Sequence, residues 1–483
     1  MDLPRPERSA PDAQRDPPDT PVPAPEPAGA APDIAGAAGP DAGSPPATAG
    51  AGQPDPEVDL GRRYFFRSLS REAIQTAAMV MGAATALQRG TATATNQLLG
   101  LVAEPPAPAA EPLPGFATAP AEPGVGFTRP YRLVDDELLL VDQRRLPEQL
   151  LEVSCLTGVD VAAAIRDGAV RGGPVLGLVA AYGTALTAAR VRDASPYMRS
   201  ATLHGTLGAL RSARPAARAI DAALDRMERR WGEIGEDADP DLLARELRAE
   251  AEAIALQAQT DHALLGRHGA ELLGQPAERP LEVLLHGTVG PLGGGGVGTA
   301  LSVVSAVVGA GRGVHCWVCE ERPSLHGARV TPWELQQADL PHTLVADGAA
   351  GWLFAQGQLE AVLVSVDRVA RNGDTAAPLG TYPLAVLAAR HGVPLYACAP
   401  LASFDPEAAR GDALRAEERS ADEVLQVLDR RSAPLGTRVR NPSVDVTPGE
   451  LIAGFVTEAG ILRPPYERTL AGAVGTGATG ERS

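Results

Sequence analysis

Five short apolar runs after residue 280 constrain the fold of this chain more than any other feature of its sequence. Patterns typical of helices separate these runs, which are LEVLLH (281–286), VHCWVCE (314–320), HTLVA (342–346), AVLVSV (361–366) and PLYACAP (394–400). Strands that alternate with helices predict a parallel sheet with helices on both faces. The expected fold class is therefore α/β, with a Rossmann-like C-terminal domain over residues 276–467.

The remaining chain divides by composition. A mostly helical N-terminal domain is expected over residues 128–275, where a short strand pair in YRLVDDELLLVDQRRLP comes first, and a flexible tail over residues 468–483. Residues 1–58 are rich in Pro, Ala, Gly and Asp and cannot bury enough apolar surface to offset their conformational entropy. They are predicted to be a disordered N-terminal extension, and the similar stretch at 99–127 a linker.

Residues 59–98 are predicted to be a helical segment, with one helix over 61–90. Arg63, Arg67 and Arg71 recur at every fourth position and form a basic stripe. Three interpretations stay open for this helix. It docks on the main domain or another subunit, it contacts an acidic partner or a membrane surface, or its RRYFFR motif belongs to a twin-arginine export signal, the least favoured of the three. Its partner is not identified by the sequence.

Charge and cysteine usage exclude several functional classes. A formal net charge of −17 and a pI near 5.0 argue against a nucleic-acid partner, because phosphate contacts need a basic surface. Four cysteines in 483 residues do not make a disulfide framework and fit a reducing cytosol, so a cytoplasmic location is expected. Cys316 and Cys319 would point to opposite faces of a strand and could not chelate one ion. No metal site is expected.

Several polar segments follow directly on the apolar runs. They are the glycine-rich loop of LLHGTVGPLGGGGVGTAL (284–301), Glu320–Pro323, Asp347–Gly348 and Asp367–Arg368. Since ligands of parallel sheets bind at the carboxyl ends of the strands, these segments are expected to gather around one crevice. The glycines of the loop, Gly290 among them, would let backbone N–H groups approach an anion, and residues 298–301 would open a helix.

A second anion-binding pattern lies in AIRDGAVRGGPVLGLVAAYG (164–183). Pro174 suits the first position of a long apolar helix, and Gly172 and Gly173 free the backbone to wrap an anion at its N-terminus. Arg171 would add a bidentate cation. The alternative is an ordinary glycine-containing helix start with an exposed arginine.

Two further residues are candidates on weaker grounds. Arg214 precedes a proline at an expected helix start, which alone indicates nothing. Asp367 at the end of an apolar run is a candidate general acid or base, with a solvated capping residue as the alternative.

Seven segments occur in an order that resembles one known family. They are LLLVDQRRLP, AIRDGAVRGGPVLGLVAAYG, ARPAARAIDAALDRM, HGTVGPLGGGGVGTAL, ERPSLHGARVTPWELQQADLP, SVDRVARNGDTAAPLGTYPLAVLAARHGVP and NPSVDVTPGELIAGFVTEAGILRPPY. Together they resemble the methylthioribose-1-phosphate isomerase family. That family is related to ribose-1,5-bisphosphate isomerases and to the regulatory subunits of the eukaryotic guanine-exchange factor for translation initiation. The resemblance covers about residues 129–467.

The resemblance implies a reaction and a set of residues. The family converts an aldose 1-phosphate into the ketose 1-phosphate without a metal or organic cofactor, so the ligand expected here is a phosphorylated pentose-like small molecule. The ring must open with acid assistance before a proton moves from C2 to C1. A cysteine serves the carbon-bound proton and an aspartate, matched by Asp367, the oxygen-bound protons. Arg171, Gly172 and Gly173 match the phosphate turn, with Gly173 in place of an alanine, and Arg214 matches a second substrate-holding arginine. A homodimer is also implied.

Three positions depart from the family pattern. The family cysteine is Gly287 in this chain, a glutamine is His326, and an Asn-Lys pair that contacts substrate is Ala377-Pro378. Two hypotheses follow. The chain is an isomerase with a shifted mechanism, in which Asp367 acts with His326 as a base that titrates near neutral pH and Cys319 stands near the crevice. Alternatively, it is a catalytically degenerate paralogue that binds a phosphorylated ligand or a protein partner in a regulatory role.

Overall fold

A seven-stranded sheet organises the C-terminal part of the protein. In sheet order its strands are β15 (Gly460–Leu462), β14 (Gly454–Thr457), β10 (Leu395–Cys398), β7 (Ala361–Ser365), β4 (Leu281–His286), β5 (Val314–Cys319) and β6 (His342–Val345). All neighbours are parallel except β14 and β15. The five apolar runs supply the five adjacent strands from β10 to β6, which confirms the predicted parallel sheet. The apolar runs did not predict the other two strands of this sheet, β14 and the edge strand β15.

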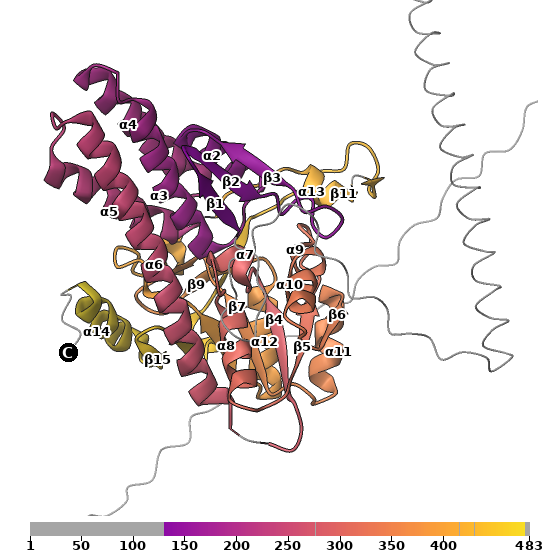
Figure 1. Cartoon of the computed structure of the whole chain (residues 1–483). Coiled ribbons are helices and arrows are strands. Elements are labelled where there is room, and N and C mark those ends of the chain that lie inside the picture. The colour runs from indigo at the N-terminus through magenta and orange to yellow at the C-terminus, as the bar shows by residue number, and fades with distance from the viewer. Residues whose placement is uncertain (1–129, 276, 415, 429, 479–483) are drawn as a thin grey trace, which may run out of the picture. The chain divides into compact units, whose positions relative to one another are not determined.

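The computed structural model describes residues 130–275, 277–414, 416–428 and 430–478 (Figure 1). The predicted extension at 1–58, the helix at 61–90 and the linker at 99–127 lie outside the described residues.

Helices cover both faces of the sheet, and alternate residues of each strand enter the two cores. Leu284 packs with one helix layer, whereas Val283 and Leu285 pack with the other. The first layer comprises α11 (Ala350–Ala355), α12 (Thr381–His391) and α14 (Tyr466–Ala478), and the second α6 (Pro240–Leu273), α8 (Ala300–Gly309) and α10 (Thr331–Gln337). This is the arrangement expected for a parallel sheet that is buried on both sides.

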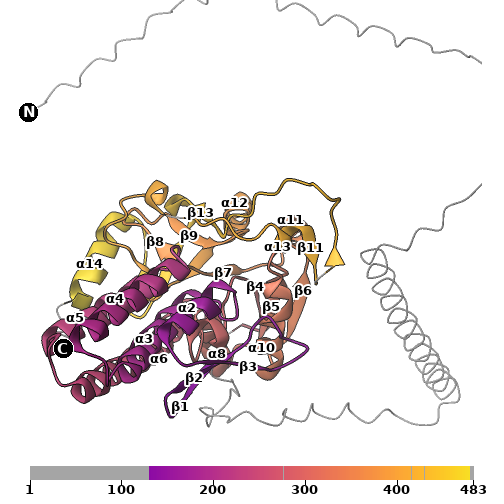
Figure 2. The ribbon, with the colours of Figure 1, turned by 90° about the horizontal axis from the view of Figure 1, so that it is seen from above.

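A mostly helical part precedes the sheet (Figures 1 and 2). Its elements are an antiparallel sheet of β1 (Tyr131–Val134), β2 (Glu137–Val141) and β3 (Glu152–Cys155), followed by α2 (Gly158–Arg166), α3 (Gly173–Arg190), α4 (Pro196–Ala213), α5 (Arg218–Ile234) and α6. The strand pair expected at the start is therefore extended by β3. Helix α6 belongs to both parts, because Leu243 and Leu247 enter the first core and Leu265 enters the core under the sheet.

Smaller elements after β7 bring distant segments back over the sheet edge. A three-stranded antiparallel sheet contains β8 (Arg368–Val369), β9 (Thr375–Pro378) and β13 (Val444–Thr447). The chain between β10 and β13 forms the short helix α13 (Asp422–Leu425) and a hairpin of β11 (Gln426–Val427) and β12 (Arg430–Arg431). These elements place the 419–443 segment beside the ends of the central strands.

The C-terminal end differs from the flexible tail expected from residue 468. Helix α14 continues to Ala478, because Tyr466 and Leu470 are buried against the sheet and the Tyr466 ring packs edge-to-face on Phe455. Among the described residues, no helix combines the length and apolarity needed to cross a membrane.

The four cysteines are free and buried. Cys316 and Cys319 enter the cores on opposite sides of β5, as their spacing on a strand predicts.

A buried carboxyl group connects α10 to the glycine-rich loop. Glu334 is 1% exposed, and its Oε1 accepts a hydrogen bond of 2.7 Å from the Leu292 N–H in the short helix α7 (Pro291–Gly294). Burial raises the pKa of Glu334 from an ordinary 4.5 to about 8, against the opposing effect of the Leu292 N–H. The folded protein therefore keeps a proton that the unfolded chain releases between these pH values.

Stability is expected to fall as pH rises from about 4.5 to about 8 because of this proton. The sign follows from the raised pKa: the stabilising contribution is fully present below 4.5 and is lost as pH rises through 8. Urea unfolding at about pH 5 and about pH 8 tests this. Glu334→Gln, which keeps an acceptor for Leu292, should flatten the dependence, and Glu271→Gln on the surface should leave the wild-type slope. An unchanged slope in Glu334→Gln contradicts the assignment.

Candidate functional site

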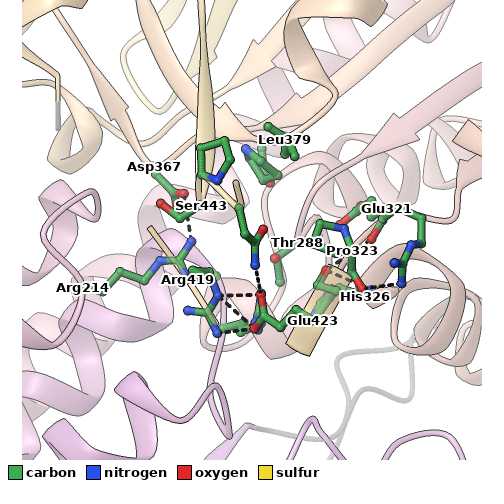
Figure 3. Close-up of a pocket in the computed structure, with 18 of the residues that line it drawn as sticks. Arg214, Thr288, Glu321, Pro323, His326, Asp367, Leu379, Arg419, Glu423 and Ser443 are labelled. Atoms are coloured by element: carbon green, nitrogen blue, oxygen red, sulfur yellow. Dashed lines mark hydrogen bonds and ion pairs between the residues drawn. The ribbon is translucent and has the colours of Figure 1, made fainter. Parts of the chain in front are cut away.

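A cavity lies where the expected crevice would be, at the carboxyl ends of β4, β5 and β7. Thr288, Glu321 and Asp367 line it directly after these three strands. The turn before α3 and the 419–443 segment close its other sides (Figure 3). Of the four segments expected to meet here, those after β4, β5 and β7 line the cavity, the glycine-rich loop through Thr288, whereas Asp347–Gly348 does not. The Asp347 carboxylate instead fixes the loop after β5, because it accepts hydrogen bonds from the N–H groups of Glu321 and Arg322 at 2.9 and 2.7 Å.

The turn at 171–174 delivers a helix N-terminus to this cavity. Gly172 has φ +115° and approaches the backbone of Gly293 so closely that a Cβ would overlap it. A Cβ on Gly173 would lie 2.9 Å from the Val366 carbonyl oxygen, which leaves little room for the alanine that the resemblance implies. No side chain caps the N-terminus of α3, so its main-chain N–H groups are available to an anion.

The side-chain amide of Gln143 connects this turn to two other segments. Its Nε2 donates to the carbonyl oxygens of Arg171 and Leu292 at 3.2 and 3.1 Å. Its Oε1 accepts from the Arg171 N–H at 3.2 Å and lies 3.0 Å from Nε2 of His326. Since Oε1 can only accept, Nε2 of His326 carries the proton and Nδ1 carries a lone pair.

His326 begins the short helix α9 (His326–Arg329) and is 2% exposed. Burial, together with the cationic Arg171, Arg329 and Arg214, lowers the pKa of His326 well below its ordinary value. The expectation of a base that titrates near neutral pH is therefore wrong: the imidazole is neutral. Its Nδ1 has no hydrogen-bond partner among the described residues and is free to accept one from a ligand.

Asp367 and Arg214 form one side of the cavity (Figure 3). Arg214 is the C-cap of α4 and lies ahead of α5, rather than at a helix start as expected. Its Nη2 is 3.7 Å from Asp367 Oδ2 and its Nε is 3.6 Å from Glu417 Oε1. Burial raises the pKa of Asp367 despite Arg214, with Glu417 adding to the rise. The main chain of Asp367 is fixed by hydrogen bonds to Ala376 and Arg218.

An arginine–glutamate cluster faces Asp367 across the cavity. Glu423 accepts from Arg171 at 3.1 Å, from Arg419 at 2.7 Å and from Asn441 at 3.0 Å. Burial, with Arg419 and Arg214 nearby, lowers the pKa of Arg171 to about 9. Two guanidinium groups face one carboxylate on this side of the cavity, so an incoming anion would be stabilised. No periodic pattern in the sequence marks Arg419 or Glu423, which lie in an irregular charged stretch; Asn441 and Ser443 belong to the NPSVDVTP segment.

Three of the expected site positions do not line the cavity. Gly287 lies just behind it at φ +92°, where a Cβ would overlap the Ser365 hydroxyl, and its N–H donates to Glu321 Oε1 at 2.6 Å. Gly290 is the N-cap of α7 and packs against the Glu334 carboxylate. Cys319 ends β5 next to the crevice but does not line it, because its side chain is buried in the core on one face of the sheet.

Three buried polar atoms without hydrogen-bond partners among the described residues belong to side chains that line this cavity. They are Nδ1 of His326, Oδ2 of Asp367 and Oγ of Ser443. Buried polar groups are almost always paired, so a cluster of unpaired ones indicates a place for a ligand. Pro378 supplies an apolar wall beside them, and no group of His, Cys, Asp and Glu in the described part of the chain could hold a metal ion.

Comparison with known proteins agrees with this geometry. Residues 169–464 match the model of the Initiation factor 2 subunit family. A methylthioribose-1-phosphate isomerase of Thermus thermophilus is 43% identical over 349 residues, which cover 72% of this chain and 98% of that protein. One from Desulforudis audaxviator is 43% identical over 345 residues, covering 71% and 97%.

Two solved structures share the fold. A 5-methylthioribose 1-phosphate isomerase from Pyrococcus horikoshii superposes with a TM-score of 0.65 at 33% identity, covering 73% of this chain and 97% of that one. The delta subunit of translation initiation factor eIF-2B from A. fulgidus gives 0.61 at 33% identity, covering 72% and 99%.

A side chain at position 287 is expected to destabilise the protein. Gly287→Ala should lower the free energy of unfolding by about 1–3 kcal/mol, because the residue would have to adopt a positive φ and displace Ser365. Gly205→Ala is the matched control: it lies on exposed α4 with nothing near its Cβ, and should raise stability by about 0.5–1 kcal/mol. Urea unfolding measures both. Equal stability of the two variants contradicts the prediction.

Proposed function

This chain belongs to the Initiation factor 2 subunit family, and we propose that its cavity isomerises an aldose 1-phosphate to the ketose 1-phosphate, with methylthioribose 1-phosphate as the first substrate to test. The observation that carries this proposal is the meeting, in one cavity, of an uncapped helix N-terminus with three buried polar atoms that lack a hydrogen-bond partner among the described residues. A sugar phosphate has both features: one dianionic group and several hydroxyls.

The phosphate would bind at the N-terminus of α3. Main-chain N–H groups there have no side-chain cap, and the guanidinium groups of Arg171 and Arg419 lie at the same side of the cavity. Arginine binds phosphate oxygens through two parallel N–H groups. Glu423 holds both guanidinium groups in place, and its pKa is lowered by them although burial acts in the opposite direction.

Asp367 suits the handling of oxygen-bound protons. Burial raises the pKa of its carboxyl group, so a larger fraction is protonated than for an exposed aspartate at the same pH. A protonated Asp367 can give its proton to the ring oxygen as the C1–O bond breaks, and the resulting carboxylate can later accept a hydroxyl proton. The neutral His326 can accept a hydrogen bond from a second hydroxyl through Nδ1. Pro378 offers an apolar surface to the thioether end of the substrate.

Ligand binding should depend on Arg171. Arg171→Ala is expected to abolish the thermal shift that methylthioribose 1-phosphate and inorganic phosphate give with the wild-type protein, because the anion loses a bidentate partner. Arg229→Ala removes an exposed arginine of α5 as the matched control and should keep the full shift. A full shift in Arg171→Ala contradicts the proposed phosphate site.

Turnover should depend on Asp367. Ketose formation from methylthioribose 1-phosphate, followed by NMR, is expected to fall by about 10²–10⁴-fold in Asp367→Asn, which keeps the shape but loses the exchangeable acid. Asp412→Asn, an exposed aspartate, should retain wild-type turnover. Binding without turnover by the wild-type protein would overturn the isomerase proposal and favour a ligand-binding paralogue.

A further inference from the structure

The proposed reaction leaves one chemical step without a group to perform it. Moving hydrogen from C2 to C1 needs a base that takes the carbon-bound proton and returns it to the neighbouring carbon. Position 287 cannot supply one, since it is glycine at a positive φ and Ser365 fills the space beside it. The base must therefore come from another segment of the cavity wall. This inference rests on the isomerase activity proposed above.

Four of the described side chains that line the cavity are bases of suitable type: His326, Asp367, Glu423 and Glu321. His326 is a weak base in this setting, because burial and three arginines lower its pKa. Glu423 is held by Arg171, Arg419 and Asn441, which leaves it poorly disposed to accept a proton. Asp367 is already engaged with oxygen-bound protons. Glu321 is left.

The position of Glu321 fits the missing role. It follows β5, is 5% exposed, and lines the cavity on the side opposite Asp367 and Arg214 (Figure 3). Its Oε1 accepts a hydrogen bond of 2.6 Å from the Gly287 N–H. The carboxylate therefore lies beside the backbone of Gly287, the position where the family resemblance implies a cysteine. Its Oε2 accepts no hydrogen bond from the part of the chain that the structure describes.

The backbone holds Glu321 in an uncommon conformation. Its φ is +62°, a region that residues other than glycine seldom adopt and that costs on the order of 1–3 kcal/mol. The carboxylate of Asp347 accepts the N–H groups of Glu321 and Arg322 at 2.9 and 2.7 Å and so fixes the loop in this form. Strain of this kind persists where the surrounding structure imposes it, commonly at active sites.

We propose that Glu321 is the catalytic base that carries the proton between C2 and C1. After Asp367 protonates the ring oxygen and the C1–O bond breaks, the C2–H bond breaks and its proton passes to Glu321. The C–H electron pair forms the C1–C2 double bond and neutralises the cationic centre at C1. Glu321 then returns the proton to C1 while the C2 hydroxyl gives its proton to Asp367 and becomes the ketone. Both carboxyl groups end in their starting states.

The electrostatic surroundings agree with this role. Burial raises the pKa of Glu321, and Asp347 adds to the rise, whereas His286, Arg171 and the Gly287 N–H oppose it. A carboxylate with a raised pKa is a stronger base than an exposed one.

The test compares Glu321→Gln with Glu320→Gln. The amide at 321 keeps an acceptor for the Gly287 N–H but cannot take a proton, so kcat for methylthioribose 1-phosphate should fall by about 10²–10⁴-fold. KM should change by less than about threefold, because the arginines that hold the phosphate are intact. Inorganic phosphate should raise the melting temperature of the variant as much as that of the wild-type protein. Glu320 lies next to it outside the cavity lining, and its variant should keep wild-type kcat. Glu321→Asp, which withdraws the carboxylate by about 1 Å, should lose about 10²-fold.

The outcomes separate the two proposals. Turnover by the wild-type protein that survives in Glu321→Gln overturns the assignment of Glu321 and leaves the isomerase proposal intact. Raised KM with unchanged kcat also overturns it, since Glu321 would then serve binding alone. No turnover by the wild-type protein overturns both proposals. Lost turnover in Glu321→Gln with an undiminished phosphate shift supports the base, because the site is then shown to be folded.

Discussion

The buried amide of Gln143 is the interaction on which the site depends. It lies just after β2 in the N-terminal part, and its four hydrogen bonds reach the turn before α3, the short helix α7 and His326 of α9. Because the amide has distinct donor and acceptor ends, it fixes the main chain that precedes an anion-binding helix and, at the same time, the tautomer of a histidine that lies 183 residues away in sequence. Side-chain packing alone could not set a proton position. A single polar group therefore couples the two parts of the protein at the place where a ligand would lie between them.

The charge distribution of the cavity would favour an anionic ligand. Arg171, Arg214 and Arg419 all line the cavity, and Glu423 and Glu417 neutralise them only in part. Burial lowers the pKa of Arg171, and the positive charges of Arg419 and Arg214 lower it further. Burial raises the pKa of the two remaining carboxyl groups, Asp367 and Glu321. An anion that enters this cavity would offset the positive charges of these arginines, and this agrees with the phosphate site proposed above.

The sequence predicted the scaffold better than the chemistry of the site. Hydrophobic runs and helix patterns are local, and they located five sheet strands and the polar loops that meet at their carboxyl ends. Arg171 and Asp367 were found because a glycine-proline helix start and a strand end are local signals as well.

The neutral state of His326 was missed because it results from burial beside arginines that are distant in sequence. Arg419 and Glu423 were missed because an irregular loop brings them back over the sheet. Arg214 was expected at a helix start because a proline follows it. Proline occurs both at helix starts and just after helix ends, and Arg214 in fact ends α4.

With Glu321 as the base, the proton-transfer group of this cavity would come from the loop after β5 and not from the loop after β4. The loops after β4 and β5 are adjacent because these strands are parallel neighbours, and a hydrogen bond from the Gly287 N–H to Glu321 joins them directly. Ser365, at the end of the next strand β7, occupies the space that a side chain at 287 would need. Asp347 holds Glu321 at a positive φ beside the glycine at 287, where Ser365 leaves no room for a side chain.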